Sequence, residues 1–552
     1  MSFLEFLDIS NIHSLIAIFI SIINAVLLVL LSKKFFQILQ ISGYKISGYR
    51  VWLKDTKAKH ISRIALLSFL SLACVWVTNS LFDVYNSGAD YSFYSYFGFI
   101  FYIYFSIVFL VNVNKPPQKT PLVQTRRMSR LMTLLFLLSF ATTFVLIWLS
   151  TVYVPFLRFG VVVLTPILLP LFVPLVHYIL IPLESLIRLR YICKAKKKLA
   201  KRTDLVRIGI TGSYGKTSVK YILNKMLGEK FNVCMTPHSF NTPMGLTKVV
   251  LKYLKPENQI LIAEMGAKQV GDVDYLCKLI KPQHAIITGV GNQHYETFGS
   301  EGNIAKAKNE LVLALPETAN VVFNCDSEKC GELYKNCKLK NKFSVSLGEK
   351  SCISAENVEF SVNGIEFDLV DGDSIIKCET ALLGKHNLLN ILMSACLATK
   401  LGVSLEQIAN AITDLEPISH RLEPIKNGNV VVLDDAYSSN EEGAKTAVEV
   451  LSLFKKYIKI CITPGIVELG EKENQVNQDL GKNLGEVCDF VIIVNKVNEQ
   501  SLKSGILKTK IKPENVLFAE NLEQAKQKLK EIMKPNEKYV VLFGNDLPDN
   551  YT

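Results

Sequence analysis

The stretch LVRIGITGSYGKTS, residues 205–218, decides the fold, because it joins three elements in a fixed order. Residues 205–211 have the pattern of a buried β-strand, the turn GSYG follows at once, and the residues after Lys216 and Thr217 have the pattern of a helix. This layout points backbone N–H groups and a helix N-terminus at phosphate. Lys216 is then placed for the β- and γ-phosphates and the Thr217 hydroxyl for Mg²⁺. The strict GxxxxGK[ST] pattern fails because Ile210 stands at its first glycine, but the context predicts a nucleotide site.

The strands that follow end in polar side chains. The stretches QILIAEMG, HAIITGVGNQH and ANVVFNCD have strand patterns and carry Glu264, His294 and Asn324 at their ends. Strands that alternate with helices predict a doubly wound α/β domain with a parallel sheet, which binds ligands outside the carboxyl ends of its strands. A carboxylate and an imidazole at that edge suit Mg²⁺ or Mn²⁺, whereas His294 alone fits a hydrogen-bonded loop histidine equally well.

A second α/β unit follows the first. The strand patterns VVVLDDAY, IKICITPG, DFVIIVN and KYVVLFG alternate with helical segments and predict a Rossmann-like C-terminal domain. We therefore expect three parts, which are a transmembrane region at 1–203, a central ATP-binding domain at 204–418 and a C-terminal domain at 419–552.

The first part is strongly apolar. A chain of 552 residues is too long for one core, and its 49% hydrophobic content and mean hydropathy of +0.24 exclude disorder and argue against a purely soluble protein. A span needs about 20 apolar residues. Five runs of about that length are present, near Ser14–Leu31, 64–82, 93–111, 131–149 and 159–181. The first lacks a signal peptide's basic start and cleavage site, and the fifth contains four prolines that predict a kinked or partly re-entrant segment.

The charge distribution predicts the orientation of these spans. The net charge of +12 divides into +16 for residues 1–203 and −4 for residues 204–552. The segments 33–63, 112–130 and 188–202 carry 21 Lys and Arg, whereas the N-terminus and the other two loops carry a single Arg158. Because basic loops stay in the cytoplasm, we expect the N-terminus outside the cell membrane and everything after residue 183 inside.

Two interpretations of the apolar part stay open. The run RLRYICKAKKKLAKR at 188–202 favours anionic lipid headgroups over nucleic acid, because it directly follows a span. No charged residue lies in the middle of a span, so no ion pathway is indicated. The spans are then an anchor or a platform for a lipid-linked substrate. The twelve cysteines show no metal-ligand spacing and are expected to be reduced.

Several ordered motifs between 204 and 552 resemble one family, the Mur ligases, which form amide bonds with ATP in peptidoglycan synthesis. The resemblance is nearest to their UDP-N-acetylmuramoyl-tripeptide D-alanyl-D-alanine ligase branch, as the motifs at 288–310, 434–440 and 468–470 indicate. The motifs are TGSYGKTS (211–218), AEMGAKQVGDV (263–273), TGVGNQHYETFGSEGNIAKAKNE (288–310), NCD (324–326), GKHNLLN (384–390), HRLEP (420–424), ELG (468–470) and DDAYSSN (434–440).

The resemblance implies ATP and two Mg²⁺ ions. Thr217, Glu264 and His294 match metal ligands, and Lys308 matches a lysine whose carbamate supplies oxygen to a second ion, with Lys306 the less favoured register. The residues implied in catalysis are Lys216, His294, Lys308 and Arg421. Those implied in nucleotide binding are Gly212, Ser213, Gly215, Lys216, Thr217, Ser218, Asn324, His386, Asn387, Asn390, Arg421 and Asp435.

The resemblance also implies a two-step reaction. A carboxylate attacks the γ-phosphate of ATP to give an acyl phosphate, and an amine then displaces phosphate. The partners are a peptide-bearing carboxylate donor, linked to a nucleotide or a lipid, an amino-acid or dipeptide acceptor such as D-alanyl-D-alanine, and membrane lipids, but no nucleic acid. Membrane spans replace the uridine-nucleotide domain of the soluble relatives, and Glu441 stands where proline is common, so both substrates stay open.

Two other functions compete with the ligase. The first is a P-loop ATPase that drives transport through its own spans, with VVVLDD as a Walker B strand, although that strand lies about 215 residues after Lys216. The second is a ligase-derived module that binds nucleotide without catalysis. The presence of all the implied catalytic residues argues against it.

Overall fold

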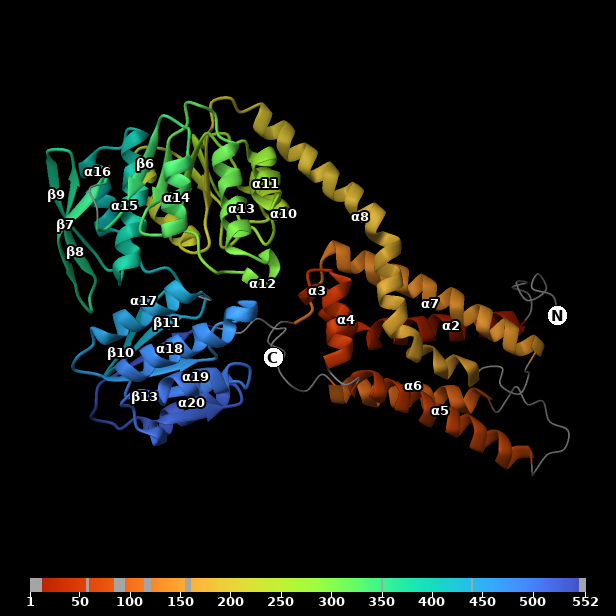
Figure 1. Cartoon of the computed structure of the whole chain (residues 1–552). Coiled ribbons are helices and arrows are strands. Elements are labelled where there is room, and N and C mark those ends of the chain that lie inside the picture. The colour runs from red at the N-terminus through yellow and green to blue at the C-terminus, as the bar shows by residue number, and fades with distance from the viewer. Residues whose placement is uncertain are drawn as a thin grey trace. The chain divides into compact units, whose positions relative to one another are not determined.

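The computed structural model describes residues 12–55, 59–83, 95–113, 121–153, 160–348, 351–437 and 440–545. The chain divides into two compact units between Ile187 and Arg188 (Figure 1). The division falls inside helix α8 (Leu169–Ala200), so the two units share one continuous helix. The domain boundaries expected from the sequence, at 203 and 418, stay a prediction.

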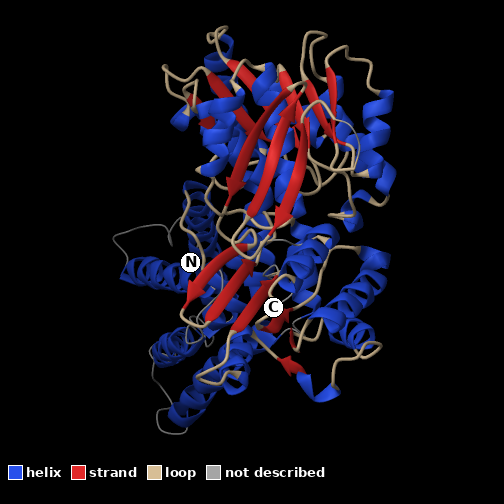
Figure 2. Ribbon diagram, turned by 90° about the vertical axis from the view of Figure 1, so that its left-hand side faces the viewer, coloured by secondary structure: helices blue, strands red, loops and turns tan. Residues whose placement is uncertain are grey.

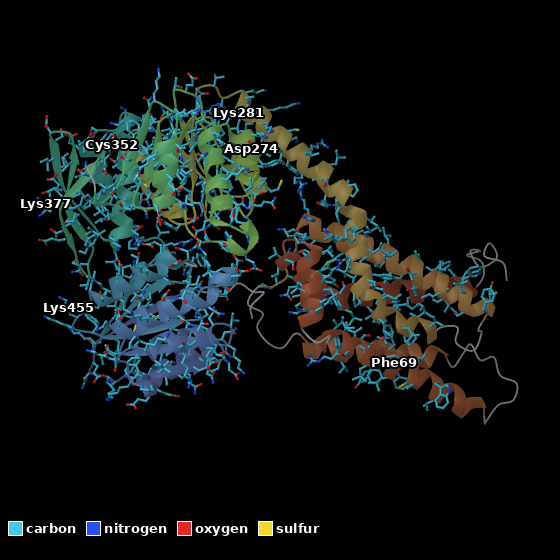
Figure 3. All side chains as sticks on the ribbon, viewed as in Figure 1. Phe69, Asp274, Lys281, Cys352, Lys377 and Lys455 are labelled. Atoms are coloured by element: carbon cyan, nitrogen blue, oxygen red, sulfur yellow. The ribbon has the colours of Figure 1, made fainter. Side chains whose placement is uncertain are left out.

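The unit that ends at Ile187 is helical. Large apolar side chains cover its outside, and Phe69, which is 59% exposed, points away from the neighbouring helices (Figure 3). An apolar exterior of this kind suits lipid. The helices are α2 (Ile12–Leu31), α3 (Lys33–Ile41), α4 (Ile46–Asp55), α5 (Lys59–Asp83), α6 (Ser95–Val113), α7 (Arg126–Tyr153) and the 3₁₀ helix η2 (Gly160–Leu168), which leads into α8.

Among the described residues, three helical segments are long and apolar enough to cross a membrane, Ser14–Leu31, Arg126–Tyr153 and Val161–Ala200. The second and third expected spans fall in α5 and α6, whose described residues include the apolar stretches Ile61–Cys74 and Phe99–Val111. Proline does not break α8, which continues through two prolines after the 3₁₀ turns of η2. The expected outer loops at 83–92 and 150–158 lie outside the described residues except for Asp83 and 150–153, which end α5 and α7. The described residues of the basic segment 33–63 are mostly helical and belong to α3, α4 and the start of α5.

One buried asparagine joins four of these elements. The Asn24 side chain donates hydrogen bonds to the Thr143 hydroxyl (2.8 Å) and the Thr165 hydroxyl (3.0 Å) and accepts one from the Tyr102 hydroxyl (2.8 Å). All four residues are buried. Because an apolar surround cannot satisfy an amide, this network fixes α2, α6, α7 and η2 against one another.

The second unit begins with a six-stranded parallel sheet, in the order β2-β3-β1-β4-β5-β6. The strand order reverses beside β1, and the phosphate loop follows β1 at this point, as the sequence predicted. The strands are β1 (Val206–Thr211), β2 (Val233–Met235), β3 (Ile260–Glu264), β4 (His284–Ile287), β5 (Val321–Asn324) and β6 (Lys342–Val345).

Helices cover the central sheet, and the end of α8 belongs to its core. Ile192, Ala195 and Leu199 of α8 pack with Leu205 and Leu276 in one apolar cluster. The helices are α9 (Lys216–Gly228), α10 (Pro243–Lys248), the π-helix η3 (Val249–Tyr253), α11 (Asp272–Ile280), α12 (Tyr295–Phe298), α13 (Glu301–Leu313), α14 (Glu328–Asn336), α15 (Lys385–Lys400) and α16 (Leu405–Thr413). The sequence did not predict the small antiparallel sheet β7 (Ser354–Phe360), β8 (Ile365–Asp371) and β9 (Ser374–Thr380).

The C-terminal sheet has the order β10-β11-β15-β12-β13-β14, and only the β10–β11 pair among the described strands of this sheet is antiparallel. Figure 2 distinguishes the strands from the helices beside them. The strands are β10 (Glu423–Asn427), β11 (Val430–Asp435), β12 (Ile458–Thr463), β13 (Phe490–Val494), β14 (Val516–Ala519) and β15 (Tyr539–Gly544). The helices are α17 (Glu441–Ser452), η4 (Gly470–Lys472), α18 (Glu473–Val487), α19 (Glu499–Ile506), η5 (Pro513–Asn515) and α20 (Leu522–Ile532).

Candidate active site

The phosphate loop requires its glycines. Gly215 has a φ of +76°, and a Cβ there would lie 3.0 Å from Asn390 Oδ1. A Cβ on Gly212 would lie 2.1 Å from Thr288 Oγ1. The Lys216 ammonium curls over the loop and donates to the carbonyls of Gly212 (2.7 Å) and Ser213 (3.2 Å). Burial lowers the pKa of Lys216 to about 8, although the charge of Glu264 opposes this shift.

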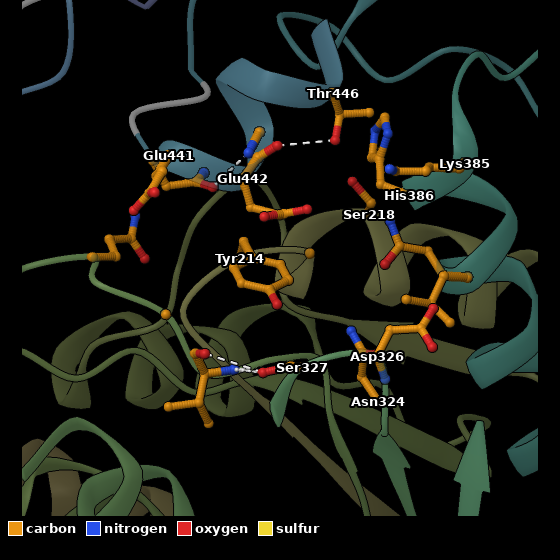
Figure 4. Close-up of a pocket in the computed structure, with 18 of the residues that line it drawn as sticks. Tyr214, Ser218, Asn324, Asp326, Ser327, Lys385, His386, Glu441, Glu442 and Thr446 are labelled. Carbon is orange, nitrogen blue, oxygen red and sulfur yellow. Dashed lines mark hydrogen bonds between the residues drawn. The ribbon is translucent and has the colours of Figure 1, made fainter. Parts of the chain in front are cut away.

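A cavity of about 590 Å³ opens beside the loop, a size that suits a nucleotide. Tyr214 lies in the middle of the lining, with Glu441 and Glu442 on the α17 side and Asn324 and Ser327 across from them (Figure 4). The predicted nucleotide residues that line it are Gly215, Ser218, Asn324, His386, Asn390, Arg421 and Asp435.

His386 carries the best indication of a bound ligand. Its Nδ1 is buried and has no hydrogen-bond partner among the described residues, although the residue lines the cavity. Burial, together with the charge of Arg421, lowers the pKa of His386 to about 4. A neutral ring with an unsatisfied nitrogen is ready to hydrogen-bond with a nucleotide.

Two predicted asparagines stabilise the site through hydrogen bonds to neighbouring residues. Asn387 donates to the Leu383 carbonyl (2.9 Å) and accepts from Asn390 Nδ2 (3.4 Å). Asn324 donates to the Thr288 carbonyl (2.8 Å), behind the phosphate loop. These bonds fix the walls of the cavity.

Glu264 lies at the end of β3, and both of its oxygens accept hydrogen bonds. Its Oε2 accepts from the Thr217 hydroxyl (3.2 Å) and from the Lys220 ammonium (2.9 Å), and its Oε1 accepts from Asn241 (3.1 Å). The Thr217 and Glu264 oxygens fit a hard divalent ion. No sequence motif indicates Lys220, whose fully buried side chain lies on the inner face of α9.

The other two predicted metal ligands, His294 and Lys308, are not part of a metal-binding group among the described residues. His294 has a φ of +59°, and its Nδ1 lies 2.5 Å from Glu468 Oε2 in the C-terminal domain. In the described part of the chain, no three His, Cys, Asp or Glu side chains gather in a metal-binding group. The two-ion site therefore stays a prediction.

Lys308 has the environment that a carbamate needs. Its side chain is 3% exposed, whereas Lys306 on the same helix is exposed. Burial and the charge of Lys216 lower the pKa of Lys308 to about 7, so a large share of the amine is neutral near neutral pH. A neutral amine is the form that reacts with carbon dioxide, and this favours Lys308 over Lys306.

A second cavity of about 760 Å³ lies on the other side of the phosphate-loop helix. Thr217 and Tyr221 of α9 line it together with His238, His420 and Arg421. Arg421 lines both cavities. This residue is therefore common to the walls of both cavities.

Comparison with known proteins identifies the family. The model of the Mur ligase middle domain matches residues 210–398, and that of the Mur ligase glutamate ligase domain matches residues 420–545, together more than half of the chain. The chain belongs to the Mur ligase family.

Relatives of this Mur ligase chain include ligases that add D-alanyl-D-alanine, as their names state. The UDP-N-acetylmuramoyl-tripeptide--D-alanyl-D-alanine ligase of Bacillus subtilis is 29% identical over 309 residues, 55% of this chain and 65% of that protein. The chain thus spans slightly less than two thirds of that relative's length. Thermotoga maritima MurF, solved in complex with ADP, is 26% identical with a TM-score of 0.58 and is covered to 80%, against 65% of this chain. Acinetobacter baumannii MurF, 24% identical, has a TM-score of 0.60 over 65% of this chain and 77% of its own, which supports the fold.

The sequence missed part of this Mur ligase site. Tyr214, Ser327 and Glu442 line the first cavity, and all except Glu442 lie within the quoted motifs or next to one, whereas Asp326, which also lines it, was expected at this edge because it ends a strand pattern with Asn324. Their place beside the motif residues was the available signal. The pairing of His294 with Glu468 had no such signal, because 174 residues separate the two.

Proposed function

We propose that this chain is a membrane-anchored, ATP-dependent ligase that forms a C–N bond in peptidoglycan precursor synthesis. It activates a peptide carboxylate as an acyl phosphate and joins it to an amino acid or a dipeptide such as D-alanyl-D-alanine. The observation that carries the proposal is the pair of cavities that share Arg421 on the two sides of the phosphate loop.

The first step needs two anions to meet. ATP occupies the cavity around Tyr214 and His386, with its phosphates at the loop and near Lys216. The donor carboxylate enters from the second cavity and attacks the γ-phosphate, which releases ADP. Arg421 offsets the repulsion between the two in this proposal, because it is a cation that lines both cavities.

The second step is attack on the acyl phosphate by the acceptor amine, with release of phosphate. Arg421 continues to hold the phosphoryl oxygens while the tetrahedral intermediate forms and breaks down. The walls that the C-terminal domain contributes keep water away from the acyl phosphate, which would otherwise be hydrolysed.

Magnesium fits this site through oxygen donors. Thr217 and Glu264 would hold one ion, and His294 with a carbamylated Lys308 would hold a second. A bound Mg²⁺ would neutralise phosphate charge as it is transferred. The residues of the chain orient the carboxylate and exclude water.

The apolar helices support a membrane location. Three segments suffice in length and composition to span a bilayer, and the basic segments around them favour an external N-terminus and catalytic domains in the cytoplasm. A location at the membrane makes either a nucleotide-linked or a lipid-linked peptide accessible as donor. The proposal thus has two forms. In one the helices bind the donor, and in the other they only anchor the enzyme.

The test uses the full chain in detergent with ATP and Mg²⁺. We expect phosphate release only when a uridine-nucleotide- or lipid-linked peptide and D-alanyl-D-alanine are both present, and a product whose mass equals their sum less water. Lys216→Met should abolish the reaction, and Lys455→Met, at an exposed lysine, should not.

The transport alternative has its own expected result in this assay. Steady ATP hydrolysis without donor or acceptor would support it and would contradict the ligase. The presumed Walker B strand is β11 of the C-terminal sheet, not a strand of the sheet that carries the phosphate loop, which disfavours transport.

A further inference from the structure

A single carboxylate of the C-terminal domain contacts the predicted metal ligand His294. Glu468 Oε2 lies 2.5 Å from His294 Nδ1, and both side chains are largely buried. The two residues also share an unusual backbone, with φ values of +59° for His294 and +66° for Glu468. Non-glycine residues adopt this region rarely and only where the surroundings enforce it.

We infer that Glu468 is a positioning residue that orients the His294 ring for a divalent metal ion. The inference rests on the proposed function, which makes His294 a metal ligand. A metal-binding histidine usually donates its second ring N–H to a carboxylate, which fixes the tautomer and makes the ligand more basic. Because Glu468 occupies Nδ1, the lone pair that faces the metal is on Nε2.

The loop that carries Glu468 is held rigidly from within its own domain. Asn477, fully buried, accepts from the Ile466 N–H (2.8 Å) and donates to the Ile466 carbonyl (2.8 Å). Asn498 also donates to the Ile466 carbonyl (3.2 Å). These bonds fix the backbone two residues before Glu468, so its carboxylate is presented in one place.

The same segment makes a second, separate contact with the His294 region. Lys472 forms an ion pair with Glu301, and its ammonium lies 4.9 Å from the centre of the Tyr295 ring. This contact can be removed without touching the His294–Glu468 pair. It therefore supplies a control that separates docking of the segment from orientation of the ring.

The position of Glu468 links metal binding to the C-terminal domain. His294 follows β4 of the central sheet, whereas Glu468 follows β12 of the other sheet. Metal affinity then depends on contact between the two domains, and the site is complete only when the 466–472 segment is in place. Metal binding in turn favours that contact, because the coupling between two sites is reciprocal.

The test measures Mn²⁺ binding to the full chain with ADP, by the loss of the free Mn²⁺ signal in electron paramagnetic resonance. No turnover is needed. We expect Glu468→Gln to weaken Mn²⁺ binding by about tenfold and Glu468→Ala by up to about a hundredfold, the range for an outer carboxylate. Lys472→Met removes one docking contact but keeps the carboxylate beside His294, so it should weaken Mn²⁺ binding much less than either Glu468 variant does. ADP affinity in the same samples confirms that each variant is folded.

Two results would overturn the inference. The first is unchanged Mn²⁺ affinity in both Glu468 variants, and the second is an equal loss in Lys472→Met, which would assign the effect to docking. His294→Asn distinguishes failure of the proposed function from failure of the inference. If that variant binds Mn²⁺ normally, His294 is not a ligand, and if it binds weakly while the Glu468 variants do not, only the role of Glu468 is refuted.

Discussion

The buried pair of Lys220 and Glu264 allows a quantitative test of the site's electrostatics. Their side chains are 0% and 1% exposed, and Lys220 also donates to the His238 carbonyl. Lys220→Met leaves the Glu264 carboxylate without its counter-charge in a site closed to water. Loss of one partner of a buried ion pair costs about 3–5 kcal/mol, so we expect the central domain to lose that much stability.

The reverse variant and the double variant complete the cycle. Glu264→Gln leaves the Lys220 ammonium without its counter-charge and should reduce the stability of the central domain by a similar amount. Lys220→Met with Glu264→Gln removes both charges and leaves mainly the His238 carbonyl without a donor, at about 1–3 kcal/mol. The double variant should therefore be more stable than either single variant.

Hydrogen exchange of β1 and β3, followed by mass spectrometry, measures these changes. Tryptophan fluorescence would not, because all three tryptophans lie before residue 188. A loss of 3–5 kcal/mol speeds globally exchanging amides by roughly 10²- to 10⁴-fold. Lys225→Met on the same helix removes an exposed pair and should cost less than about 1 kcal/mol. A double variant as unstable as the sum of the singles would refute the reasoning.

Three further predictions concern other parts of the chain. Lys308→Ala should be inactive and partly rescued by short carboxylates, and full activity of this variant would contradict the carbamate. In the unchanged protein, labelled bicarbonate should give a carbamate signal. This signal should weaken as the pH falls below about 7, because the amine of Lys308 then takes up a proton. A chain that starts at Arg188 should be more stable than one that starts at Leu205 by roughly 3–6 kcal/mol, since three side chains of α8 pack in the central core; equal denaturation midpoints would contradict this. Asn24→Leu should destabilise the helical unit by roughly 2 kcal/mol, from three hydrogen bonds at ~0.6 kcal/mol each, in unfolding followed by tryptophan fluorescence; an unchanged midpoint would show that the network adds no stability.

Local pattern made much of the fold predictable. The strand, turn and helix around Lys216 follow one another directly in the chain, and the buried strands of both sheets are continuous apolar runs, which sequence reveals without tertiary information. The β7–β9 sheet was missed because Glu356, Glu359 and Glu366 interrupt the apolar residues of β7 and β8, so neither strand forms a continuous apolar run.

Pairings between distant segments could not be predicted in the same way. In the sequence, Lys220 is one polar position of a predicted helix. Its pairing with Glu264 at the end of β3 is visible only in the folded structure. The basic run at the end of α8 favours lipid headgroups by its sequence, but its apolar residues recur at every third or fourth position and face the central core.

The position of Arg421 in the lining of both cavities has a consequence for ligand design. Two cavities that share a lining residue can be filled by a single molecule that carries a nucleotide at one end and a carboxylate or its mimic at the other. Once the nucleotide end is bound, the other end is confined near its own compartment at an effective concentration set by the length of the linker. A linked molecule whose tether is just long enough to pass Arg421 should bind more tightly than the nucleotide end or the carboxylate end alone. The tether length that binds best would measure the path from γ-phosphate to carboxylate.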